Sequence, residues 1–175
     1  MGMPRSPAPV KLIAGLLASS DDLLAEAREA LGQRFGPVDA CSMPSTWGFS
    51  DYYSSEMGDF IRRQFISFGK LIAPGQLAGV KHLTNEMENA WRTESGRRVN
   101  IDPGYIAAAK LVLASTKEAA HRVYLGDGIY AEATLHFSHR SFQPYPYSYR
   151  DYAAADAIAF FNAVRSRYLI QVRES

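Results

Sequence analysis

This chain of 175 residues has a single cysteine, no long apolar run and little net charge. The single cysteine, Cys41, excludes an internal disulfide and a cysteine-based zinc site, and it favours a reducing, cytoplasmic location. No run approaches the roughly 18 apolar residues of a membrane-spanning helix. Residues 1–9 are rich in proline and lack the apolar core of a signal peptide. A formal net charge of +1 gives no indication of a nucleic-acid partner or an anionic membrane.

Two fingerprints of familiar chemistry are also missing. A P-loop needs the string GxxxxGK[ST], because its backbone N–H groups wrap the phosphates, and the chain contains no such string. This argues against a P-loop GTPase and leaves other modes of nucleotide binding open. His136 and His139 lie three residues apart on a predicted strand and point to opposite faces, so they make a poor metal site. We predict no metal ligands and assign no cofactor.

The remaining composition is that of an ordinary globular protein, with 47% hydrophobic and 21% charged residues. At this length the simplest organisation is one domain with a substantial core. We predict a flexible lead over residues 1–9 and a single domain over residues 10–175, with no internal repeat and no interdomain linker.

The clearest strand lies over residues 129–138, where apolar and polar side chains alternate with a period of two. It follows residues 122–125 across Gly126-Asp127-Gly128, which predicts a β-hairpin. A three-residue loop places apolar residues opposite apolar ones. The predicted pairs are Leu125 with Ile129, Tyr124 with Tyr130, Val123 with Ala131, and Arg122 with Glu132.

The rest of the chain predicts alternating strands and helices. Strands are expected over residues 10–18, 38–43, 63–71 and 99–102, the last ended by a type II turn at residues 102–105. Residues 110–114 fit a strand or a helix. Apolar residues at helical spacing predict a first helix from Leu23 to Leu31, a second from Leu77 to Trp91 and a long final helix from Ala154 to Tyr168. The order up to Asp102 is the ferredoxin-like βαββαβ pattern. We therefore predict an α+β fold, extended by the C-terminal hairpin and final helix, with a mixed sheet and helices largely on one face.

Several stretches of the chain are specific enough to compare with a family. They are VKLIAGLLAS (10–19), DYYSSEMG (51–58), VNIDPGYI (99–106), KLVLASTK (110–117) and HRVYLGDGIYAEATL (121–135). These stretches resemble a family of bacterial proteins of unknown function, some of which are labelled GTP-binding proteins. The resemblance runs from Val10 to about Tyr152. It implies a shared fold and a soluble bacterial protein, and it implies no activity.

Polar side chains that share a predicted sheet face form the candidate site. The predicted ligand-binding residues are Asn100, Asp102, Lys110, Lys117, His121, Arg122, Tyr124, Tyr130 and Glu132. Arginine and lysine suit a phosphate or carboxylate, and Glu132 or His136 would act as acid or base in any reaction. The leading hypothesis is a module that binds a small anionic ligand, such as a nucleotide, for example GTP. A solvated sheet face that binds no ligand is the open alternative.

Two other functions remain open. The aromatic loop Trp47–Tyr53 and the Pro/Tyr segment Gln143–Tyr149 suit a protein partner or a homo-oligomer. The strings His82-Leu83-Thr84 and His136-Phe137-Ser138 match the HxT/HxS pattern of two-histidine phosphoesterases. On the predicted helix, however, His82 and Thr84 are about 200° apart and cannot converge. The phosphoesterase therefore ranks third.

Overall fold

The computed structural model describes residues 2–49, 54–58 and 60–174. The strands are β1 (Val10–Ala18), β2 (Val38–Cys41), β3 (Ser45–Thr46), β4 (Arg62–Ile72), β5 (Val99–Ile106), β6 (Lys110–Ser115), β7 (Val123–Gly126), β8 (Ile129–Ser138) and β9 (Ser141–Pro144). The helices are α1 (Asp21–Phe35), α2 (Ser54–Met57), α3 (Leu77–Glu88) and α4 (Ala155–Glu174), with short 3₁₀ turns at Pro74–Gln76 and Asn89–Trp91. Residues 110–114, left open by the sequence, belong to strand β6.

The described strands form one sheet in the order β2-β4-β1-β5-β6-β8-β7, with β3 added to β4 and β9 to β8. The α+β class is confirmed, but the predicted mixed sheet is wrong, because every described pair is antiparallel. Each helical connection skips one strand: α1 leads from β1 to β2 past β4, and α3 leads from β4 to β5 past β1. Strands that run in the same direction are therefore never adjacent in the described sheet. The ferredoxin-like interpretation of this order stays a prediction.

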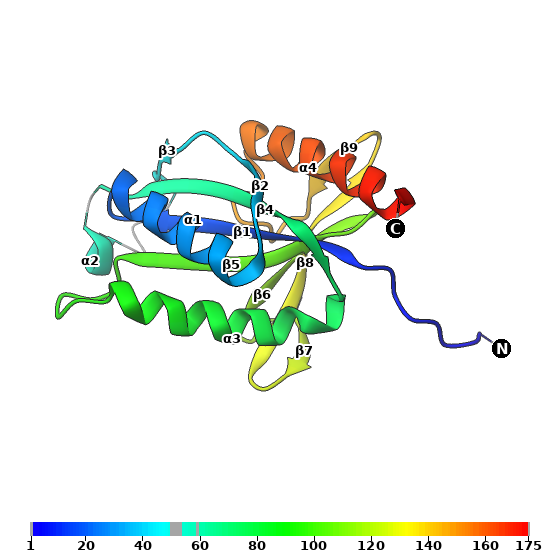
Figure 1. Ribbon diagram of the computed structural model, residues 1–175, viewed down its shortest axis with the longest axis horizontal. Helices are drawn as coiled ribbons and strands as arrows, with labels where there is room; N and C mark the ends of the chain where they lie inside the picture. Colours follow the sequence, from blue (N-terminus) through cyan, green and yellow to red (C-terminus); the bar gives the residue numbers. More distant parts are fainter. Residues whose placement is uncertain (1, 50–53, 59, 175) are drawn as a thin grey trace.

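Helices cover both faces of the sheet (Figure 1), which corrects the expectation of helices largely on one face. All nine residues of β1 are buried. Leu12 packs with Leu24 of α1 and Val80 of α3, whereas Ile13 on the opposite face packs with Phe161 of α4. A central strand that is apolar on both faces needs cover on both sides, and α4 supplies the second cover. Among the described residues, no helix is long and apolar enough to cross a membrane.

Strand β5 runs straight through Pro103 and Gly104, where a type II turn was predicted. Its whole length pairs with β1, but its pairing with β6 covers only Gly104 to Ile106. Proline lacks an N–H and is confined to strand edges, and Pro103 lies where β5 becomes an edge on its β6 side. The first half of β5, before Pro103, does not pair with β6, and the end of β6 pairs only with β8. The two strands therefore separate there.

The hairpin between β7 and β8 differs in detail from its prediction. Tyr124 lies opposite Tyr130, and Val123 opposite Ala131, as expected. The loop has two residues rather than three, because Gly126 pairs with Ile129 and Leu125 sits in a bulge. Asp127 (φ 52°) and Gly128 (φ 74°) both have positive φ, which is the type I′ geometry that matches the twist of paired strands.

The close approach of β5 and β6 predicts a sharp effect of Gly104→Ala. A Cβ at this position would lie 2.3 Å from the backbone oxygen of Val112, which cannot swing aside. We expect the free energy of unfolding to fall by about 3 kcal/mol, the upper end for an overpacked core, as measured by urea unfolding. Gly79→Ala in α3 is the control, because a Cβ there meets nothing within 4 Å and alanine favours a helix. Equal stability of Gly104→Ala and wild type would contradict the contact.

Candidate functional site

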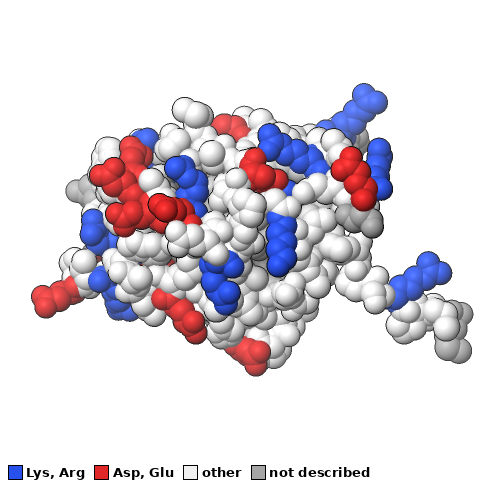
Figure 2. All heavy atoms as spheres, in the orientation of Figure 1, with Lys and Arg blue, Asp and Glu red and all other residues white. Residues whose placement is uncertain are grey.

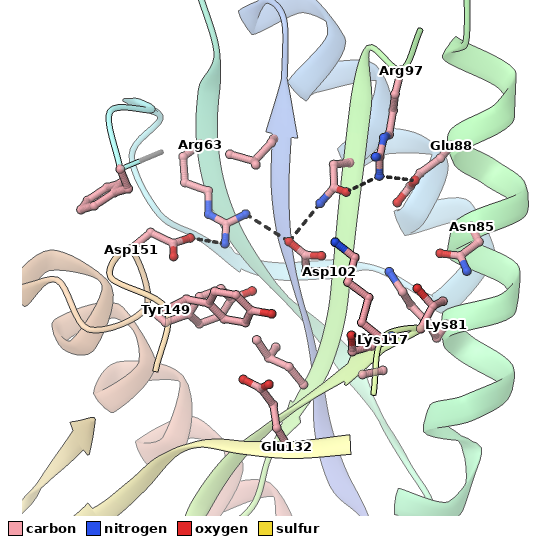
Figure 3. A pocket seen from close by; sticks show the side chains of 18 of the residues that line it. Arg63, Lys81, Asn85, Glu88, Arg97, Asp102, Lys117, Glu132, Tyr149 and Asp151 are labelled. Atoms are coloured by element: carbon pink, nitrogen blue, oxygen red, sulfur yellow. Dashed lines mark hydrogen bonds and ion pairs between the residues drawn. The ribbon is translucent and has the colours of Figure 1, made fainter. Parts of the chain in front are cut away.

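A cavity of about 780 Å³ opens where β5 and β6 separate. Its walls come from β4, α3, the first half of β5, the end of β6, β8 and the segment 147–152. Figure 3 shows α3 on one side, Arg63 and Asp151 on the other, Asp102 between them and Glu132 below. The split in the sheet thus gathers side chains that lie far apart in the sequence.

Arg63 is the most buried cation of the cavity, with 3% of its surface exposed. Its Nη2 lies 2.5 Å from Asp151 Oδ2, and its Nη1 lies 3.6 Å from Asp102 Oδ2. The guanidinium also stands 4.5 Å from the ring centre of Phe65 and 5.0 Å from that of Tyr152. Two carboxylates and two aromatic faces therefore fix the position of one buried positive charge.

Glycine is required at position 15 for this arrangement. A Cβ on Gly15 would lie 2.3 Å from the Tyr152 hydroxyl oxygen and 2.9 Å from Nη2 of Arg63. Gly15 lies opposite Asp102 in the pairing of β1 with β5. The bare backbone of β1 therefore forms the floor on which Arg63 and Tyr152 rest.

The polar residues of α3 replace the missing strand beside β5. Nζ of Lys81 donates to the carbonyl oxygen of Ile101 at 2.9 Å, and Oε1 of Glu88 accepts from the Ile101 N–H at 2.7 Å. A neighbouring strand would normally bond these two backbone groups, and buried backbone groups need a partner. Lys81, Asn85 and Glu88 are spaced to share one face of the helix, and all three line the cavity.

An ion-pair and hydrogen-bond chain continues along β5 (Figure 3). Asn100 Nδ2 donates to Asp102 Oδ2 at 3.0 Å, and Asn100 Oδ1 accepts from Arg97 Nη1 at 2.9 Å. Arg97 also lies 3.7 Å from Glu88 Oε2 and 3.1 Å from Glu56 Oε2. Asn100 is therefore fixed at both ends of its amide, and the wall is held by charges of both signs.

Glu132 is buried and surrounded by donors on β8 and on the loop that precedes β7. Its Oε2 accepts from Arg122 Nε at 2.8 Å and lies 3.2 Å from His121 Nε2, while Oε1 accepts from Thr134 Oγ1 at 3.0 Å. Arg122 also donates to the Tyr149 hydroxyl at 2.7 Å. Glu132 therefore holds Arg122, His121 and Thr134 together beside the cavity.

Burial and the charge of Asp102 set the electrostatics of the cavity. Burial raises the pKa of Glu88 and of Asp151, against the opposing charges of Lys81 and Arg63 respectively. The negative charge of Asp102 raises both values further, and it acts in the same direction on the pKa of Tyr152. Asp102 thus lies near all of these groups, and no metal-binding group of three or more His, Cys, Asp or Glu occurs in the described part of the chain.

The structure brings together only part of the predicted site. Asn100, Asp102, Lys117 and Glu132 line the cavity, and His121 and Arg122 contact Glu132 from behind it. The other predicted residues lie outside the described lining: Lys110 opposite His136, and Tyr124 opposite Tyr130. Lys110 begins β6, whereas the cavity lies at the other end of that strand.

Four buried charged residues of the cavity were missed by the sequence: Arg63, Lys81, Glu88 and Asp151. On α3, the apolar stripe was identified, and Leu77 and Val80 are indeed buried. A parallel stripe of polar residues, Lys81, Thr84 and Glu88, is buried as well. Its helical spacing was the signal available to find it. No comparable sequence pattern identifies Arg63 or Asp151 as site residues.

The histidines of the phosphoesterase pattern lie outside the described lining of the cavity. His82 is exposed, with Nε2 2.9 Å from the carbonyl oxygen of Asp127. The ring of His136 lies against Tyr145, with ring centres 4.7 Å apart. The two histidines therefore have separate surroundings, and the cavity does not use the pattern.

The buried Glu88 predicts a pH effect on stability. The pKa of Glu88 is raised in the folded state above its ordinary value of 4.5, so the folded protein holds more protons and loses stability as pH rises through this window. Glu88→Gln keeps an acceptor for the Ile101 N–H and cannot ionise. We expect its free energy of unfolding, measured with urea at a series of pH values, to improve relative to wild type as pH rises above 4.5.

Glu86→Gln is the control for this comparison, since Glu86 lies in the same helix and is exposed. Its pH profile should run parallel to that of the wild type. A Glu88→Gln profile that also runs parallel, or that falls more steeply with pH, would contradict the burial of an ionisable carboxyl at this position.

One comparison with known proteins gives a match. A family model described as a domain of unknown function (DUF4416) matches residues 8–168. The match begins two residues before β1 and ends within α4, so it includes every residue that lines the cavity. It agrees with the expected family of unknown function, while the GTP-binding label and the bacterial source stay predictions. No curated protein and no solved structure matches the chain.

Proposed function

The chain belongs to the DUF4416 family, and we propose that it binds a small anionic ligand in the cavity between β5 and β6. The observation that carries this proposal is a set of exposed basic side chains on the cavity lining: Arg92, Lys117 and Arg150. They come from three separate segments, after α3, after β6 and before Asp151. Lysine and arginine at the mouth of a cavity suit a phosphate or a carboxylate.

The balance of charge supports an anion at the mouth. The buried charges of the interior are paired, as Arg63 is with Asp151 and Arg122 is with Glu132. The exposed acidic residue of the described lining, Glu56, contacts Arg97. Among the described lining residues, the exposed cations therefore outnumber the exposed acids, and this balance favours an anionic group.

Size and aromatic content support a ligand as large as a nucleotide. A volume of about 780 Å³ falls within the range of roughly 300–1,000 Å³ that is usual for small-molecule sites. Trp47 and Tyr149 are among the lining residues, and aromatic faces stack on planar rings. Tyr147 also lines the cavity, but its ring is already stacked on His121 and Tyr145. More specifically, we propose that the ligand is GTP or another nucleotide, bound without a P-loop.

A protein-interaction module is the second candidate. The segment Gln143–Tyr149, predicted to dock a partner, is used inside the molecule: Tyr147 donates to the Ala133 carbonyl and Ser148 to the Thr134 carbonyl. In the aromatic loop, Trp47 packs with a buried cluster, and residues 50–53 lie outside the described residues. The observation that favours this candidate is exposed apolar surface on β7, where Val123 is 70% exposed.

Thermal unfolding against a panel of anions tests the proposed function. The panel contains inorganic phosphate, ribose 5-phosphate, GTP, ATP and citrate, each at millimolar concentration. A ligand that binds the folded state raises the unfolding midpoint as its concentration passes the Kd. We expect at least one anion to do so, and Lys117→Ala to weaken that anion's Kd by about tenfold, which is about 1.4 kcal/mol.

Lys110→Ala is the matched control, because Lys110 is an exposed lysine at the start of β6, whereas Lys117 follows the end of that strand. It should leave the midpoint shift of wild type unchanged. The proposal is wrong if no anion shifts the midpoint, or if Lys110→Ala reduces the shift as much as Lys117→Ala does.

A further inference from the structure

Asp102 presents one carboxylate oxygen to the cavity. Its Oδ2 accepts from Asn100 Nδ2 at 3.0 Å and lies 3.6 Å from Arg63 Nη1. Among the described residues, no hydrogen bond reaches Oδ1. The side chain is 30% exposed although it stands in the middle of the site (Figure 3). Oδ1 is therefore an acceptor available to a ligand.

Tyr152 adds a buried hydroxyl that has no hydrogen-bond partner in the described part of the chain. The residue is 1% exposed and lines the same cavity. Its ring is stacked on Phe161 with ring centres 5.6 Å apart, and its hydroxyl is pressed against Gly15. Packing thus prevents the hydroxyl from turning elsewhere for a partner, and buried polar groups are costly without one. A hydroxyl group both donates and accepts, so it suits a ligand hydroxyl.

The charge of Asp102 already has a cationic partner, because Oδ2 lies 3.6 Å from Arg63 Nη1. The other buried charges of the cavity are of both signs, with Lys81 and Glu88 on α3 and Asp151 paired with Arg63. A neutral donor therefore suits Oδ1, and the unpartnered Tyr152 hydroxyl in the same cavity both donates and accepts. The ligand group at this position is therefore best a hydroxyl.

Resting on the proposed function, we infer that the ligand is a phosphorylated sugar. Its neighbouring hydroxyls bond Asp102 Oδ1 and the Tyr152 hydroxyl on the cavity floor, and its phosphate meets the basic mouth at Lys117 and Arg150. A carboxylate acceptor for sugar hydroxyls and cations for phosphate are the contacts this class of compound needs. The shared chemistry is a phosphate joined to a diol, supplied either by a free sugar phosphate or by the ribose of a nucleotide.

Asp102→Asn tests the sugar contact with little change of shape. The amide must keep its oxygen toward the donors Asn100 Nδ2 and Arg63, so its NH₂ group replaces the acceptor Oδ1. We expect the Kd for ribose 5-phosphate, measured by isothermal titration calorimetry, to rise at least tenfold. The Kd for inorganic phosphate should stay within twofold. Asp127→Asn is the control, because it makes the same charge change on the exposed hairpin turn.

Tyr152→Phe supplies a second measurement that does not depend on Asp102. Removing the unpartnered hydroxyl should raise the thermal midpoint of the ligand-free protein and at the same time weaken ribose 5-phosphate binding at least threefold. A merely structural tyrosine would change the midpoint without a selective loss of the sugar phosphate. GMP, compared with ribose 5-phosphate, distinguishes the sources: tighter binding of GMP supports a nucleotide, and equal or weaker binding supports a free sugar phosphate.

The failures of the two proposals are distinguishable. If ribose 5-phosphate binds no better than inorganic phosphate, or if Asp102→Asn changes both affinities equally, the sugar inference is overturned while anion binding stands. If neither compound binds the wild type and no anion of the wider panel does, the proposed function fails and this inference fails with it.

Discussion

The separation of β5 from β6 is the constraint on which the rest of the site depends. Two adjacent residues set it: Pro103 has no N–H for a ladder, and Gly104 lets the strands touch because a Cβ there would meet Val112 at 2.3 Å. On one side of this point the sheet is continuous, and on the other it is open. A cavity therefore forms inside a sheet that α1, α3 and α4 otherwise cover on both faces.

Opening a sheet exposes backbone groups, and the protein satisfies them with charged side chains. Lys81 and Glu88 bond the carbonyl and the N–H of Ile101, which places an ammonium and a carboxylate in the interior. The desolvation of two buried charges costs much of the free energy that their attraction provides. The pair therefore contributes little to stability beyond what apolar packing would give. The charges instead give the opened edge of β5 a polar lining. On the face shown in Figure 2, a group of acidic side chains lies over the start of α1, and acidic and basic side chains are scattered over the rest.

The sequence predicted what depends on local pattern. Period-two alternation located β8 and placed Tyr124 opposite Tyr130, and helical spacing located the buried Leu77 and Val80. The predictions from sequence failed where the conformation of one strand depends on its pairing with another. Asp102 to Tyr105 has the local chemistry of a turn, yet pairing with β1 along its whole length holds it extended. Arg63 was missed for the same reason, since only the tertiary fold brings Asp102 and Asp151 to it.

The polar side chains of the cavity are held in fixed positions, which suits the ligand binding proposed above. Glu132 accepts from Arg122 and Thr134 and lies beside His121, so its carboxylate is fixed through both oxygens. Asp102 is held through Oδ2 by Asn100 and Arg63 and presents Oδ1 to the cavity. Groups held in this way accept hydrogen bonds at fixed positions. A site made of such groups distinguishes one ligand from another by the placement of hydrogen-bond donors and charge on the ligand.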